Sequence, residues 1–264
     1  MDRSKIVWHH HTPQQHNTRE LMSNTKQIAL VTGANKGIGF ETARQLAQRG
    51  FIVWIGCRNE VRGVAAAQEL AKDGDVRFVR LNVTDAESVQ AAAARIENET
   101  GALDVLVNNA GIAVGESDNC PSSVQIEAIR RTFDVNFYGV LLVTQAFLPL
   151  MRKATTGRIV NMSSTVGSLT ALVSPGSYLP RLPLFAYASS KTALNALTTW
   201  FAVELRETAI KVNAVCPGYI ATDLNNHSGT QHPSEGAKVV VRAATLGPDG
   251  PSGTFFDLNG SIGW

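Results

Sequence analysis

The sequence predicts an α/β fold, a three-layer α/β/α sandwich around a Rossmann-type, doubly wound parallel sheet of about seven strands. From Gln27 onward, short β-rich apolar runs alternate with longer Ala-rich segments of helical character. Several of the short runs are apolar on both faces, which is typical of strands covered by helices on each side. A glycine-rich turn directly follows the first run, as in folds that bind ligands beyond the strand ends.

The strands are expected, in chain order, at 28–32, 51–56, 76–81, 103–107, 158–162, 211–215 and 254–258. Helices are expected at 37–49, 60–72, 85–99, 123–151, 186–207 and 234–244. Ahead of the third helix, Thr84 and Glu87 have the spacing of a capping box. The alternation never pauses for a linker, so residues 27–264 are expected to form a single Rossmann-fold domain.

Composition and charge exclude several classes of protein. The 264-residue chain has a net charge of +2 and no basic run, which argues against nucleic acid as a partner. Its three cysteines include no C-x-x-C pair, which disfavours a disulfide framework or a zinc site and fits a reducing compartment. No apolar stretch resembles a signal peptide or approaches the ~18 residues of a membrane span. We therefore expect a cytoplasmic protein with no membrane partner.

Residues 1–26 are expected to form a flexible polar tail. Four of the six histidines lie there, at His9, His10, His11 and His16. Their spacing is not the helical spacing that would fix a coordination geometry, so a tail is favoured over a metal site. No metal is expected elsewhere in the chain.

The run from Thr32 to Gly39 places glycines between the first strand and the first helix. Free N–H groups at a helix start, together with the positive end of the helix dipole, bind anions, and glycine lets a ligand approach the backbone. The turn therefore suits the pyrophosphate of a dinucleotide. The residues expected to contact it are Gly33, Asn35, Lys36, Gly37, Ile38 and Gly39.

Tyr187 and Lys191 are four residues apart in a helical segment, so both side chains lie on one helical face. A neighbouring cation favours the phenolate and lowers the pKa of a tyrosine toward the working range. An isolated pair of this kind is more often a core aromatic residue and a solvated lysine. In the context of a dinucleotide turn, we interpret it as a proton-transfer pair.

Cofactor choice depends on the end of the second strand, where an acidic residue would bind the adenosine ribose of NAD. This chain has Gly56, Cys57 and Arg58 there. With no carboxylate, the Arg58 guanidinium and the Lys36 ammonium favour a 2′-phosphate, hence NADPH (NADP) over NADH. The alternative for each cation is a solvated surface charge.

Four motifs occur in the order typical of one family: the Thr-Gly-x-x-x-Gly-x-Gly turn, the run Asn108–Gly111, Tyr-x-x-x-Lys, and Pro217-Gly218. The chain resembles the classical short-chain dehydrogenases/reductases (SDR) from about Gln27 to its C-terminus. Through the runs 57–63 and 235–237 it is most similar to the NADPH-dependent carbonyl reductases, or ketoreductases, of that family.

The resemblance implies four catalytic residues. Tyr187 would protonate the carbonyl oxygen as hydride arrives at the carbon, and Lys191 would lower its pKa while holding the nicotinamide ribose. Ser164, in preference to Ser163, would hydrogen-bond the substrate carbonyl. Asn136 would help to hold a water near the lysine.

The resemblance also implies cofactor contacts beyond the glycine turn. Asn82 stands where many relatives have aspartate beside the adenine, and its amide oxygen still accepts hydrogen bonds. The remaining contacts are implied at Val83, Asn109, Ala110, Gly111, Pro217, Gly218, Ile220 and Thr222, as well as at Tyr187 and Lys191.

The function implied is the NADPH-dependent reduction of a small-molecule ketone or aldehyde to the alcohol. Two alternatives remain open: an NAD(P)-dependent alcohol or hydroxysteroid dehydrogenase working oxidatively, and a non-catalytic protein that senses NADPH. The Pro-containing segment between Ser164 and Tyr187 is expected to form a loop over the pocket, with a purely structural connection as the alternative. Residues 225–236 could be a lid. A homo-oligomer through the two long helices is a further possibility.

Overall fold

The computed structural model describes residues 26–115 and 118–264. Except for Lys26, the predicted tail and its four histidines lie outside these residues. The described chain contains a seven-stranded sheet in the order β3-β2-β1-β4-β5-β6-β7, with every pair parallel. The strands are β1 (Ile28–Thr32), β2 (Ile52–Cys57), β3 (Val76–Arg80), β4 (Val105–Asn108), β5 (Gly157–Met162), β6 (Ile210–Val215) and β7 (Phe255–Phe256).

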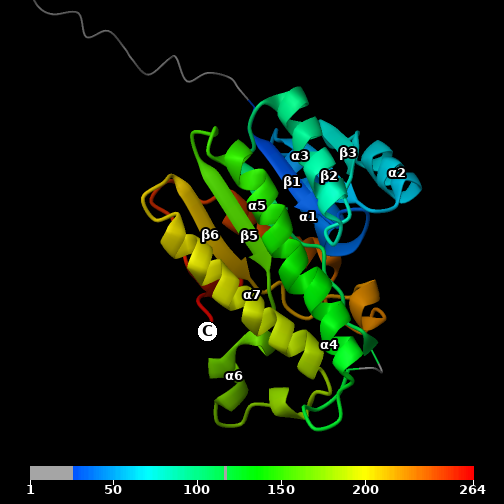
Figure 1. Cartoon of the computed structure of the whole chain (residues 1–264), viewed down its shortest axis with the longest axis vertical. Helices are drawn as coiled ribbons and strands as arrows, with labels where there is room; N and C mark the ends of the chain where they lie inside the picture. Colours follow the sequence, from blue (N-terminus) through cyan, green and yellow to red (C-terminus); the bar gives the residue numbers. More distant parts are fainter. Residues whose placement is uncertain (1–25, 116–117) are drawn as a thin grey trace, which may run out of the picture.

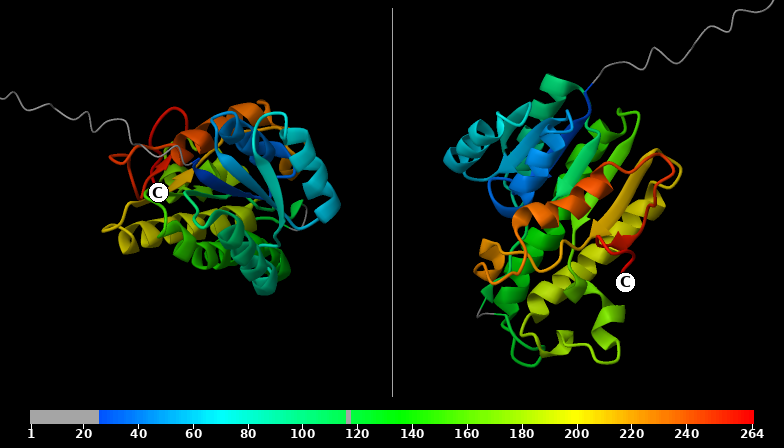
Figure 2. Two further views of the ribbon diagram at one scale, coloured as in Figure 1. Left: turned by 90° about the horizontal axis from the view of Figure 1, so that it is seen from above. Right: turned by 180° about the vertical axis from the view of Figure 1, so that it is seen from behind.

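Helices cover both faces of the sheet (Figures 1 and 2). One layer consists of α1 (Gly37–Ala47), α2 (Glu60–Leu70) and α8 (Pro233–Ala244), and the other of α3 (Ala86–Thr100), α5 (Gly139–Met151) and α7 (Phe185–Glu204). Alternate side chains of β1 enter the two cores: Leu30 packs in the cluster with α3, α5 and α7, and Val31 in the cluster with α1, α2 and α8. The predicted three-layer sandwich is confirmed.

The strand order reverses between β1 and β4, because β1 pairs with β2 on one side and with β4 on the other. In an open α/β sheet, ligands bind in the crevice beyond the carboxyl ends of the strands at such a switch point. The glycine turn follows β1 and the run Asn109–Gly111 follows β4, so both predicted cofactor segments lie at this point.

The long helix predicted at 123–151 is interrupted. It consists of α4 (Ile126–Phe133), a π-helical turn η2 (Asp134–Tyr138) and α5. Such π-turns are rare and occur frequently at functional sites. Among the described residues, this helical run, Ile126–Met151, is long and apolar enough by length and composition to cross a membrane, although polar residues such as Asp134 and Asn136 interrupt it. Its apolar side chains have a place in the fold, because Val143, Phe147 and Met151 of α5 pack in the core against the sheet.

The capping box predicted at Thr84 is wrong. The cap of α3 is Asp85, whose carboxylate accepts hydrogen bonds from the N–H groups of Glu87 (3.0 Å) and Ser88 (3.2 Å). The Thr84 hydroxyl instead donates to Asn82 Oδ1 at 3.1 Å. A carboxylate accepts two helix N–H groups where a hydroxyl already engaged elsewhere cannot.

Between the main elements lie short helical turns. They are η3 (Thr165–Gly167), α6 (Leu169–Val173), η4 (Leu179–Arg181) and η5 (Asp223–Asn225). Figure 1 shows α6 and the chain around it standing beyond the lower end of the sheet. These turns belong to the segments after β5 and β6, which are predicted to form the substrate side of the site.

Candidate active site

The glycine turn lies directly on the segment after β4. Gly33 and Gly37 have positive φ angles, 64° and 61°, which glycine adopts without strain. A Cβ on Gly33 would lie 2.9 Å from the Ala110 Cα, and a Cβ on Gly39 would lie 2.4 Å from the Asn109 Nδ2. The close approach of two backbones therefore requires glycine here.

Thr32, the last residue of β1, joins the two segments by hydrogen bonds. Its hydroxyl oxygen accepts from the N–H groups of Asn109 and Ala110, both at 3.0 Å. The Asn109 side chain donates in return to the Thr32 carbonyl at 2.8 Å. These hydrogen bonds hold the carboxyl ends of β1 and β4 together. The glycine turn and the segment Asn109–Gly111 are called the cofactor floor below.

Helix α7 brings Tyr187 and Lys191 to this floor. The Lys191 Nζ lies 5.5 Å from the centroid of the Tyr187 ring and donates to the Met162 carbonyl at 2.7 Å. A Cβ added to Gly111 would lie 3.6 Å from that Nζ, so the ammonium is next to the segment after β4. The lysine is 4% exposed. The structure thus brings the predicted proton-transfer pair to the predicted cofactor segment.

Burial controls the protonation of this pair. It raises the pKa of Tyr187 above its ordinary value, an effect that the charge of Cys216 reinforces and a hydrogen bond with Ser164 opposes. Burial also lowers the pKa of Lys191 to about 8. From the spacing alone, Lys191 is expected to lower the pKa of the phenol; the direction in the structure is the opposite, because desolvation disfavours both charged forms. A protonated phenol at neutral pH is the form that a general acid requires.

The two neighbouring serines at the end of β5 have different surroundings. Ser163 is buried, and its hydroxyl donates to Asn195 Oδ1 at 2.6 Å. Ser164 is near enough to the Tyr187 phenol for their hydrogen bond to affect its pKa. Because Ser163 is engaged with Asn195, Ser164 is the better candidate of the two to act beside the tyrosine.

Asn136 lies in the π-turn and is fully buried. Its amide donates to the Ile112 carbonyl (2.9 Å) and to the Ser190 hydroxyl (3.0 Å), and its oxygen accepts from the Ile112 N–H (2.9 Å). Ser190 in turn donates to the Tyr187 carbonyl at 2.7 Å. The side chain therefore ties the segment after β4 to α7, while its role at a water molecule stays a prediction.

The two cations predicted to bind the 2′-phosphate differ in their surroundings. Arg58 is exposed just after β2, and no ion pair joins it to any residue that the structure describes. Lys36 instead pairs with Asp223, which also lies 2.9 Å from His227 Nε2. Arg58 is thus available to an anion, whereas Lys36 bridges the glycine turn and the segment after β6.

The remaining predicted cofactor residues lie in the glycine turn and on the segments that follow β3 and β6. Val83 lies against the start of α5, since a Cβ on Gly139 would lie 2.9 Å from its Cγ2. The Asn82 oxygen accepts from Thr84, as described above. Thr222 faces the glycine turn, with its Cγ2 3.6 Å from the Cβ position of Gly37. Asn35 and Ile38 belong to that turn, and Pro217, Gly218 and Ile220 belong to the segment that carries Thr222.

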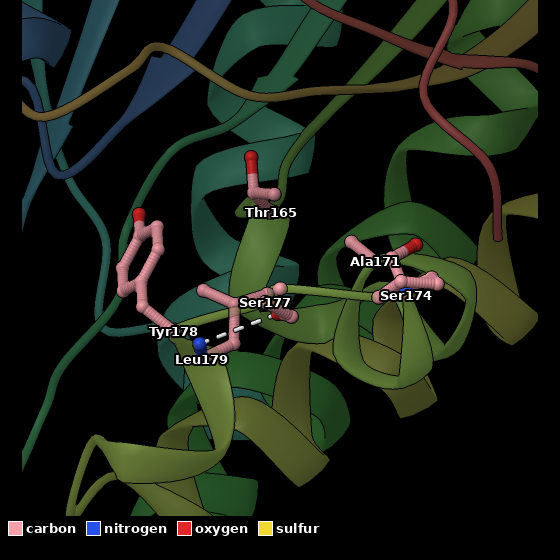
Figure 3. A pocket seen from close by; sticks show the side chains of 8 residues that line it. Thr165, Ala171, Ser174, Ser177, Tyr178 and Leu179 are labelled. Atoms are coloured by element: carbon pink, nitrogen blue, oxygen red, sulfur yellow. Dashed lines mark hydrogen bonds between the residues drawn. The ribbon is translucent and has the colours of Figure 1, made fainter.

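A pocket opens beside Thr165, the residue that follows Ser164 in the chain (Figure 3). All eight of its lining residues are uncharged: Thr165, Ala171, Ser174, Pro175, Gly176, Ser177, Tyr178 and Leu179. Residues of the segment between Ser164 and Tyr187 therefore line a pocket, and its use by the substrate stays a prediction. The predicted lid at 225–236 contains Asn226 and His227, both with positive φ angles.

Sequence reasoning missed two residues of the site. Cys216 is buried, and its Sγ lies 3.2 Å from the Thr165 hydroxyl. Asp118 is buried, and its carboxylate accepts from the N–H groups of Ala186 (2.7 Å) and Tyr187 (2.9 Å). Neither lies in a sequence motif, and the Asp118 contacts span 68 and 69 positions, so no local signal could have found them.

Comparisons with known proteins agree with this geometry. The family model for short chain dehydrogenase matches residues 27–233. The chain is 35% identical to (-)-isopiperitenone reductase of Mentha piperita, over 89% of this chain and 97% of that protein. It is 36% identical to carbonyl reductase [NADPH] 1 of Mus musculus, with the same shares covered.

Solved structures give the same result. Salutaridine reductase from Papaver somniferum superposes with a TM-score of 0.77 at 32% identity, covering 88% of this chain and all of that one (100%). An NADPH-bound carbonyl reductase from chicken fatty liver superposes with a TM-score of 0.79 at 29% identity, covering 91% of this chain and 99% of that one.

Proposed function

We propose that this chain, which belongs to the short-chain dehydrogenase family, reduces a ketone or aldehyde to the alcohol with NADPH as the hydride donor. One observation carries the proposal: α7 holds Tyr187 and Lys191 beside Gly111, at the switch point of the sheet. The proton donor, Tyr187, therefore lies next to the cofactor floor.

The residues of the crevice fit NADPH. The backbone of Gly33 and Gly37 turns at positive φ, which leaves room for a pyrophosphate at the start of α1. The exposed Arg58 suits a 2′-phosphate, and the segment 217–222 lies against the glycine turn where it would hold the carboxamide. When bound, NADPH supplies the hydride that reduces the carbonyl carbon.

The side chains supply the proton and the orientation. Tyr187, kept protonated by burial, donates its phenolic proton to the carbonyl oxygen. The Ser164 hydroxyl hydrogen-bonds the same oxygen and holds the carbonyl in line with the phenol. Lys191 holds the nicotinamide ribose. Asn136 fixes the segment after β4 through Ile112, so the floor and the helix keep their relative positions.

The substrate is a small, uncharged carbonyl compound. The pocket that Thr165 lines, directly after Ser164 in the chain, has only uncharged lining residues, among which Leu179 and Ala171 supply apolar surface. A charged substrate would lose hydration here without gaining a partner among these lining residues.

The experiment is to follow nicotinamide absorbance with purified protein, a panel of aldehydes and ketones, and NADPH and NADH in parallel. We expect NADPH to be consumed much faster than NADH. The control, Tyr187→Phe, removes the proton donor and should lower kcat by about 10²- to 10⁴-fold. Turnover only of alcohols with NAD would support the oxidative alternative. Tight NADPH binding without turnover would support the sensor.

The proposal places the reaction in the cytoplasm, because all three cysteines are free thiols. It also includes a homo-oligomer formed through the long helices, since Trp200 and Val203 of α7 are exposed. Light scattering on the wild type and on Trp200→Glu tests the assembly, and a wild-type monomer would contradict it.

A further inference from the structure

The first turn of α7 is held by a residue from a distant part of the chain. The residue before the helix is Leu184, whose side chain cannot accept a hydrogen bond. Asp118 takes over this role: its Oδ1 accepts from the Ala186 N–H at 2.7 Å, and its Oδ2 accepts from the Tyr187 N–H at 2.9 Å. The adjacent Asn119 carbonyl accepts from Phe185 at 3.1 Å. Three successive N–H groups of α7 thus bind one short segment.

Asp118 is buried for a charged residue, with 3% of its surface exposed. Its Oδ1 also accepts from the Asn119 N–H at 2.9 Å, so the carboxylate is satisfied by backbone donors alone. The positive end of the helix dipole adds to this stabilisation. A carboxylate buried in this way fixes the helix start far more firmly than water would.

The segment that carries Asp118 begins at the cofactor floor. Asn109 and Ala110 are bound to Thr32, and Ile112 is bound to Asn136. The chain after β4 therefore makes successive contacts with the glycine turn, with the π-turn and with the residue that bears the catalytic phenol.

We propose that Asp118 is a positioning residue for the reduction, which fixes the Tyr187 phenol relative to the cofactor crevice by holding the Tyr187 backbone. The inference rests on the proposed function. A proton donor must lie within hydrogen-bond reach of the carbonyl oxygen, and a displacement of about 1 Å can cost on the order of 10²-fold in rate. Asp118 acts through Tyr187 and does not touch the substrate.

A matched control exists in Asp85. Its carboxylate also accepts two helix N–H groups, but at the start of α3, and it is exposed. Loss of either cap removes the same two hydrogen bonds from a helix start. Only the cap on α7 binds the backbone of Tyr187, the residue that carries the phenol.

The test compares the steady-state kinetics of Asp118→Ala, Asp118→Asn and Asp85→Ala, with the carbonyl substrate and NADPH each varied in turn. We expect Asp118→Ala to lower kcat by about 10- to 100-fold, with the KM for NADPH changed by less than about threefold. Asp118→Asn should lie between it and the wild type, because the amide keeps one acceptor oxygen but turns a donor toward the second N–H. Asp85→Ala should leave kcat within about twofold while lowering the melting temperature.

Hydrogen exchange gives a readout independent of turnover. The amides of Ala186 and Tyr187 should exchange faster in both Asp118 variants and stay protected in Asp85→Ala. An active wild type whose kcat is unchanged in Asp118→Asn and Asp118→Ala would overturn this inference alone. A kcat loss of equal size in Asp85→Ala would also overturn it, since loss of any cap would then suffice. A wild type that turns over no carbonyl compound would overturn the proposed function together with it.

Discussion

The two sides of the crevice are built differently. On the cofactor side, the glycine turn and the segment after β4 are in backbone contact, tied by the Thr32 hydroxyl and closed by glycines with no room for a side chain. On the substrate side, the wall consists of short helical turns, and Val173 and Tyr178 are 80% and 65% exposed. The first is a rigid backbone cradle, and the second is a surface made of side chains.

This difference follows from what each side must bind. A dinucleotide phosphate is recognised by backbone N–H groups at a helix start, which demands a fixed turn. A carbonyl compound is recognised by shape and apolar contact, which different side chains can supply. We therefore expect substitutions on the two sides to affect different kinetic constants.

Among the substitutions that distinguish the two sides, the largest effect is expected at Arg58 on the cofactor side. Arg58→Glu replaces an exposed cation by a carboxylate that repels the 2′-phosphate, so the KM for NADPH should rise by about 100-fold. The KM for NADH should stay the same or fall, because a carboxylate can accept hydrogen bonds from the ribose. Steady-state kinetics with both cofactors measure the change.

Arg62→Glu is the matched control for this substitution, since Arg62 is exposed on the neighbouring α2. It introduces the same change of charge and should alter the KM for NADPH far less. Equal effects of the two substitutions would show that NADPH binding depends on the overall charge of this surface and not on Arg58 itself.

Smaller effects are expected from alanine substitutions at Gly39 and Gly176, which compare the two sides directly. A Cβ on Gly39 would lie 2.4 Å from the Asn109 side chain, so Gly39→Ala should lower the free energy of unfolding by about 1–3 kcal/mol. It should also raise the KM for NADPH, because Asn109 anchors the floor. Denaturant unfolding and steady-state kinetics measure the two effects.

Gly176→Ala places a methyl group in open space at a φ of 78° on the pocket wall. It carries only the cost of the left-handed backbone, about 1 kcal/mol. Its kinetic effect should be confined to the KM for the carbonyl substrate. A rise in the KM for NADPH in this variant would contradict the separation of the two sides.

The sequence predicted the cofactor side better than the substrate side for a physical reason. The glycine turn, Tyr187 and Lys191 could be identified because their roles depend on local spacing along a turn and a helix face. The π-turn at Asn136 could not be predicted, since its geometry depends on contacts with Ile112 and Ser190.

The direction of the Tyr187 pKa was missed for a related reason. Spacing places Lys191 nearby, but the burial that raises the pKa of the phenol comes from the packing of the whole site. The N-cap of α3 shows that spacing can mislead even among neighbouring residues. Thr84 has the expected spacing, yet its hydroxyl is engaged by Asn82, and Asp85 takes the role.

The smallest effect is expected at Tyr178 on the pocket wall. The side chain lines the pocket and is largely exposed, so it can contribute only part of its apolar surface to a bound substrate. Tyr178→Ala should raise the KM for an apolar ketone by about three- to tenfold and leave the KM for NADPH unchanged.

The control for Tyr178 is Tyr138→Ala, which removes another exposed tyrosine, from the π-turn, where it packs edge-on against Phe137. If the wall is a side-chain surface independent of the cofactor cradle, only Tyr178→Ala changes the ranking of ketones by size. If NADPH affinity falls together with ketone affinity in Tyr178→Ala, the wall and the cradle move as one body, because a surface residue on one side would then set the geometry of the other.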